Sequence, residues 1–114
     1  MKATEVSDLF AKLATREPTG YRLGTPVLDT AAPEFRRLVD LGSAVVPDIV
    51  AQLLSAPARK AAWMLAALGQ IGDPRALPTV RECCARSDAR EPTGEWDYAV
   101  RGQCRLVLET LAGK

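Results

Sequence analysis

Residues 61–78 constrain the fold of this chain more than any other segment, because they predict a helix, a tight corner and the start of a second helix. Before the corner, the apolar side chains that fall at helical spacing are Ala61, Met64, Leu65, Leu68 and Ile71. At the corner, Gly72 suits the left-handed backbone that ends a helix, Asp73 can cap the next helix, and Pro74 fits its first position. The segment therefore predicts two helices joined by a short turn.

The same pattern returns on both sides of this segment. About 30 residues earlier, Leu38 and Gly42 repeat the leucine and the glycine that precede the central corner. About 40 residues later, after an insertion at residues 87–97, Cys104 and Leu111 repeat half of the apolar stripe. The chain therefore has the spacing of a degenerate helical repeat protein.

The N-terminal residues predict one more amphipathic helix, with an apolar stripe made by Val6, Leu9, Phe10 and Leu13. This helix would cap the array, because terminal repeats of such folds are usually atypical. We expect a single all-α domain over residues 1–114. Its cap helix and a long loop would occupy residues 1–32, and its repeats residues 33–114.

Residues 61–78 resemble the HEAT-like repeats of the phycobilisome-lyase type. The family pattern contains Ala-Leu-Gly, Ile-Gly-Asp and Ala-Leu-Pro, which stand here at residues 67–69, 71–73 and 76–78. Looser matches extend the resemblance over about residues 33–112. The resemblance implies a short right-handed α-solenoid of about six helices and roughly two and a half repeats. It also implies a concave, partner-binding face lined by the second helices, although the family name is no sign of lyase activity.

The polar side of the predicted second helices is the candidate partner-binding surface. Its members are Asp48, Gln52, Arg75, Thr79, Glu82 and Arg86, with Trp96 and Tyr98 at one edge. Aromatic side chains near a loop are common binding anchors. The favoured alternative for these two is that they pack against the neighbouring helix, and Trp63 is assigned to the core. Because acidic and basic side chains balance on this face, nucleic acid is not the expected partner.

The string Arg-Glu-Pro-Thr-Gly occurs twice, at residues 16–20 and 90–94. Turn chemistry is the simpler interpretation, since proline and glycine suit β-turns. The alternative is that both loops contribute to one surface for a partner. The first loop is long for a compact domain, and its apolar members predict that it packs against the helices. They are Tyr21, Leu23, Val27 and Leu28.

The composition removes much catalytic chemistry, because the 114 residues include no histidine. The cysteines Cys83, Cys84 and Cys104 lack a second metal-type pair, so no metal site is expected. Cys84 and Cys104 fall on apolar stripes, which predicts thiols packed in the core. The odd number of cysteines favours a reducing, cytoplasmic location. The lack of asparagine and the excess of arginine over lysine suit a bacterium with a GC-rich genome.

We therefore expect no enzymatic activity and no cofactor. The predicted function is protein–protein interaction, as an adaptor, a scaffold or a toxin-immunity protein. The alternative is an accessory subunit or chaperone-like factor for a chromophore-processing or nucleic-acid enzyme. The net charge of +1 argues against bulk nucleic acid or an anionic membrane as the partner. No apolar run approaches the roughly 20 residues of a membrane span.

Overall fold

The computed structural model describes residues 3–113, which are mostly helical. The helices are α1 (Ala3–Ala14), α2 (Pro33–Leu41), α3 (Val46–Leu53), α4 (Ala58–Ile71), α5 (Leu77–Asp88) and α6 (Glu95–Ala112). Short 3-10 turns, Gly42–Val45 and Pro74–Ala76, lead into α3 and α5. The predicted helical content is confirmed, but strands β1 (Gly20–Arg22) and β2 (Thr25–Val27) pair as an antiparallel hairpin. None of the described helices is both long and apolar enough to cross a membrane.

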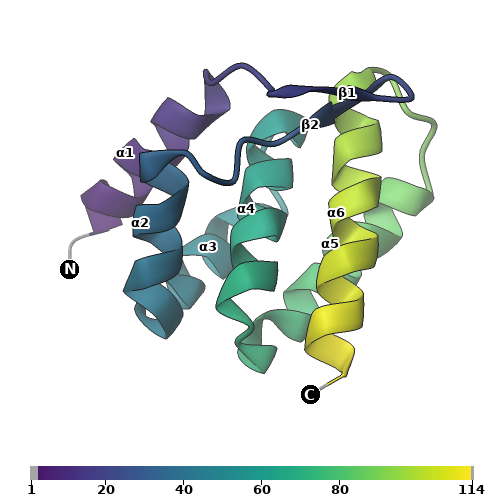
Figure 1. The fold of residues 1–114 in the computed structure, drawn as a ribbon. Coiled ribbons are helices and arrows are strands. Elements are labelled where there is room, and N and C mark those ends of the chain that lie inside the picture. The colour runs from purple at the N-terminus through teal and green to yellow at the C-terminus, as the bar shows by residue number, and fades with distance from the viewer. Residues whose placement is uncertain (1–2, 114) are drawn as a thin grey trace.

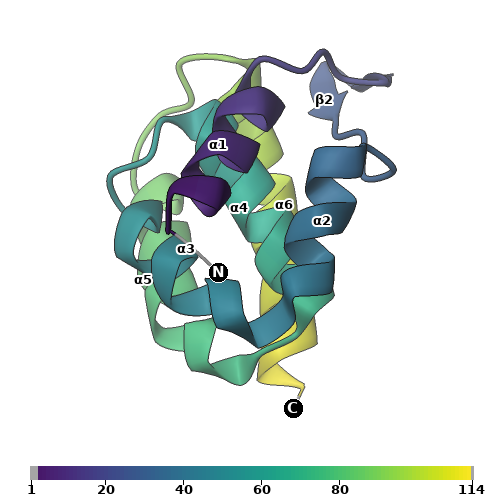
Figure 2. The same cartoon turned by 90° about the vertical axis from the view of Figure 1, so that its left-hand side faces the viewer.

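The helices form two layers (Figure 1). Helices α2, α4 and α6 lie side by side, while α3 and α5 pack against each other behind them. Figure 2 shows the layers from the side, with α3 and α5 on one side and α2 and α6 on the other. Helix α1 packs against α2 and α4, where it covers the open side of the central helix.

Helix α4 lies at the centre of the domain and contacts α1, α2, α3 and α6. All residues from position 61 to position 68 are buried, so the expectation of a single apolar stripe was wrong. Its alanines lie between the larger side chains, and their small size lets neighbouring helices approach closely. Trp63 is fully buried, with its ring centroid 5.7 Å from that of Phe35, which confirms its place in the core.

The corner after α4 has the predicted chemistry. Gly72 adopts a left-handed conformation with φ of +75°, and its N–H donates to the carbonyl of Leu68 at 2.9 Å. The Asp73 carboxylate accepts a hydrogen bond from the backbone N–H of Arg75 at 2.9 Å. Asp73 therefore caps the 3-10 turn that begins at Pro74, one turn before α5 itself begins.

The hairpin is a correction to the irregular loop expected between the first two helices. Its strands have three residues each and show no clear alternation of apolar and polar side chains. Leu23 and Gly24 form its turn with φ of +50° and +81°, the left-handed geometry of a type I′ turn. Such turns favour Asn-Gly, so a leucine in the first position hides the usual sequence signal.

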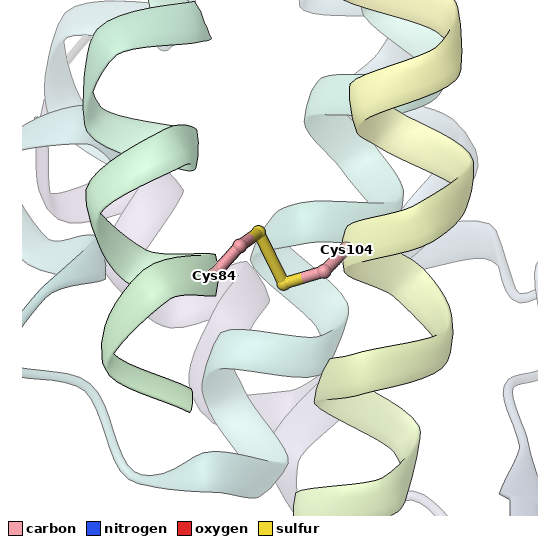
Figure 3. The surroundings of a disulfide bond; sticks show 2 residues. All are labelled: Cys84 and Cys104. Carbon is pink, nitrogen blue, oxygen red and sulfur yellow. A yellow bond between two sulfur atoms is a disulfide. The ribbon is translucent and has the colours of Figure 1, made fainter. Parts of the chain in front are cut away.

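A disulfide joins Cys84 of α5 to Cys104 of α6 (Figure 3). Both residues are buried, as expected, but the expectation of two free thiols was wrong. Helices α5 and α6 pack together, which brings the two Cα atoms to 5.7 Å, within the usual range for a disulfide. The cysteines therefore no longer favour a reducing compartment, since disulfides persist mainly in oxidising ones.

Candidate functional site

The predicted partner-binding residues on α3 and α5 lie on neighbouring helices. We define the α3–α5 face as Asp48, Gln52, Thr79, Glu82 and Arg86. Its first three members are half-buried, and the last two are exposed. Glu82 and Arg86 form an ion pair at 3.0 Å within α5. Gln52 donates to the backbone carbonyl of Asp48 at 3.2 Å, so the polar groups of this face make mostly local contacts.

Arg75, the remaining basic candidate, lies in the 3-10 turn before α5, and this turn packs against both α3 and α5. Its Nε and Nη2 atoms donate to one carboxylate oxygen of Asp73 at 3.0 and 2.8 Å. Its Nη2 atom also donates to the backbone carbonyl of Ser43 at 3.2 Å. Hydrogen bonds from the Arg75 side chain and backbone hold the pKa of Asp73 well below its usual range. Arg75 thus connects the corner before α5 to the turn before α3.

The two aromatic candidates at the edge lie in different surroundings. Trp96 is half-buried and packs against the core, and the guanidinium of Arg59 lies 4.7 Å from its ring centroid. Tyr98 is 51% exposed and lines a groove beside the hairpin. The expected packing against a neighbouring helix therefore holds for Trp96 and is wrong for Tyr98.

The two Arg-Glu-Pro-Thr-Gly loops are held in the same way at their first residue. Arg59 donates to the backbone carbonyl of Arg16 at 2.6 Å, and Arg101 donates to that of Arg90 at 2.8 Å. After this residue the two loops differ. In the second loop, the backbone N–H and hydroxyl of Thr93 donate to Asp97 at 2.7 and 3.0 Å, which ties the end of the loop to the first turn of α6.

The two loops also lie at the same end of the molecule (Figure 1). Tyr21 and Glu95, which directly follow the two copies, form a hydrogen bond at 3.3 Å. Arg59 connects the loops a second time, because it binds the carbonyl of Arg16 and stacks over Trp96. Neither copy forms the expected turn at its proline, because Pro18 and Pro92 lie in irregular backbone and Gly20 begins β1. A shared surface for a partner stays a prediction.

A groove lies between the hairpin and α6, and sequence reasoning missed it. It has a volume of about 800 Å³. The exposed apolar side chains that line it are Leu23, Val27, Tyr98 and Leu106. We call it the hairpin groove. Leu106 could have indicated this groove from the sequence alone. This leucine falls outside the apolar stripe of the last helix, so its exposure could have been predicted.

Burial of the apolar loop residues was mostly predicted wrongly. Leu28 is 7% exposed and does pack into the core. Tyr21, Leu23 and Val27 are 56%, 102% and 41% exposed. The hairpin explains the difference, because its short strands direct only the middle residue of β2, Pro26, into the protein.

The free thiol and the carboxylates form no further site. Cys83 is half-buried, and this burial raises the pKa of its thiol, which lowers its reactivity. Within residues 3–113, no group of three or more Cys, Asp or Glu residues is arranged to hold a metal ion.

The family expected from the HEAT-like motif stays a prediction. Comparisons of the chain with protein-family models, with curated proteins and with solved structures find no match.

Proposed function

We propose that this protein is a non-enzymatic protein-interaction module, of the adaptor, scaffold or toxin-immunity type. It would be a short right-handed α-solenoid of HEAT-like repeats, and its partner would bind the α3–α5 face. The observation that carries this proposal is the packing of α3 beside α5, with polar side chains left at the surface.

The two helix layers support this proposal. In stacked helix pairs, the second helices of successive pairs line one continuous face, which commonly binds a partner. In the proposed repeats, α3 and α5 would be the second helices, since each follows a corner after α2 or α4 along the chain and α3 packs against α5.

The charges on this face are available to a partner. The side chains of Glu82 and Arg86 are 52% and 59% exposed, so their ion pair contributes at most about 1 kcal/mol to folding. Asp48 forms no salt bridge within the described residues. A binding partner could therefore replace these weak local contacts with interactions of its own.

A charge swap on α5 tests the proposal. The double variant Glu82→Arg with Arg86→Glu keeps the net charge and keeps the two opposite charges four residues apart. It reverses the order of the charges on the face. The wild-type protein and the swap would be used to capture partners from the native host, with quantitative mass spectrometry as the readout. We expect a partner that the wild type retains and the swap loses by at least about tenfold.

A matched control is available on α1. Asp8 and Lys12 are exposed, have opposite charges and are four residues apart, as Glu82 and Arg86 are. The swap Asp8→Lys with Lys12→Asp should leave capture unchanged. Equal loss in both swaps, or no loss in either, would contradict binding through the α3–α5 face.

A further inference from the structure

One wall of the hairpin groove, the hairpin itself, is fixed by contacts with the rest of the protein. The other wall, on α6, carries exposed side chains. Pro26 and Leu28 are buried against the protein, and β2 packs against α6. The hydrogen bond from Tyr21 to Glu95 holds β1 near the start of α6. The hairpin therefore has a defined position, while Tyr98 and Leu106 of α6 remain exposed beside it.

Leu23 at the tip of the hairpin combines two unfavourable features. It is the only described residue other than glycine with a positive φ, at +50°, where a β-carbon crowds the backbone. Its side chain is also 102% exposed, so it gains nothing from burial. Asparagine or glycine would fit this turn better. Unusual backbone conformations cluster at binding sites. A strained and fully exposed leucine therefore indicates a residue that a partner covers.

The charges along the groove all have one sign. Arg22, Arg101 and Arg105 line it, and no aspartate or glutamate of residues 3–113 does. Arg101 is engaged, because it donates to the backbone carbonyls of Ser87 and Arg90 at 3.4 and 2.8 Å. Arg22 and Arg105 form no salt bridge with any described carboxylate. These two guanidinium groups are therefore free to bind an anionic partner.

We propose that the hairpin groove binds a short acidic peptide segment that carries apolar side chains and belongs to another protein. Leu23, Tyr98 and Leu106 would contact its apolar side chains, and Arg22 and Arg105 would bind its carboxylates. The mixture of apolar surface and isolated cations favours such a peptide over a nucleic acid, which would need a denser basic surface. This site is separate from the α3–α5 face and gives the module a second binding surface.

Selection from a random peptide display library against the intact protein tests the proposal. We expect the selected sequences to be enriched in aspartate or glutamate next to leucine or an aromatic residue. The peptide recovered most often would then be labelled with fluorescein and titrated. Its affinity should fall by at least about tenfold for Leu23→Asn and for Arg105→Glu, because each removes a main contact. The swap at Asp8 and Lys12 should leave the affinity unchanged.

The other outcomes would overturn the proposal. These are no enrichment, enrichment without acidic residues, or an affinity that the Leu23 and Arg105 variants do not change. Peptides that respond only to the swap at Glu82 and Arg86 would support the α3–α5 face and remove the groove. Groove-dependent binding of single-stranded RNA or anionic phosphatidylserine vesicles, without peptide binding, would assign the groove to a different ligand. Dimerisation that Leu23→Asn abolishes would assign it to a second copy of this chain.

Discussion

The centre of α4 and the hairpin use leucine in opposite ways. Leu65 is fully buried in a helix that is enclosed on all sides, whereas Leu23 is fully exposed in a left-handed turn. The first gains stability from burial, while the second gains none and has a strained backbone. The difference teaches that hydrophobic side chains at the centre hold this domain together and that those exposed at the hairpin do not, which is why we propose the hairpin as a contact for another molecule.

The largest expected effect comes from making the same substitution in both regions. Leu65→Ala should reduce the free energy of unfolding by about 2–5 kcal/mol, because it removes buried contacts and leaves a cavity. Leu23→Ala should change it by less than about 0.5 kcal/mol, since that side chain contacts solvent. Urea unfolding followed by circular dichroism measures both values. Similar losses in the two variants would remove the distinction between the regions.

Reduction of the disulfide tests whether the covalent bond adds to the stability of the packed helices α5 and α6. Cys84 and Cys104 are 20 residues apart, and closing a loop of that size restricts the unfolded chain by about 3 kcal/mol. Reduction with dithiothreitol should lower the free energy of unfolding by about that amount. Cys83→Ser should change it little, because Cys83 is free and only half-buried. A chain that contains three titratable thiols without reductant would show that the bond does not form.

The turn of the hairpin gives a smaller effect of opposite sign. Leu23→Asn should raise the free energy of unfolding by about 0.5–1 kcal/mol, because asparagine tolerates the left-handed backbone. Leu106→Asn is the matched control, since this leucine is also exposed but lies within α6. Leu106→Asn should not raise the free energy of unfolding. If Leu23→Asn lowered the melting temperature, Leu23 would have a structural role. The backbone strain at the hairpin tip would then no longer support a binding site there.

The smallest effect concerns acid sensitivity at the two ends of the helical core. Hydrogen bonds from Arg75 hold the pKa of Asp73 low, and those from the Thr93 backbone and side chain lower that of Asp97. Carboxyls with a depressed pKa stabilise the folded state above their unfolded pKa of about 3.9, and this contribution disappears as the pH falls further.

Stability should therefore be constant near neutrality and fall below about pH 4. Asp73→Asn and Asp97→Asn should each flatten this acid limb, as thermal melts between pH 7 and pH 2 would show. Asp8→Asn is the control, since Asp8 is exposed on α1 and has no salt bridge in the described structure. An acid limb that all three variants leave unchanged would contradict a role for the Asp73 and Asp97 carboxylates.

The candidate site could be predicted only in part. Glu82 and Arg86 follow from helical spacing, because a polar stripe opposite an apolar one is a local pattern. The hairpin groove could not be found in this way. Its turn lacks the usual Asn-Gly, and its two walls come from segments that are far apart in the sequence. The bond between Tyr21 and Glu95 joins residues separated by 74 positions, and no local pattern encodes that contact.

The sequence alone determined the helices, the corner at Gly72 and Asp73, and most of the buried apolar residues. These features depend on interactions within a few residues, where periodicity, caps and left-handed glycines act. Only the tertiary structure decided that α4 is enclosed on all sides, that Cys84 bonds to Cys104, and that Leu23 projects beside α6. Each of these depends on how distant segments pack, which the spacing of residues along the chain does not specify.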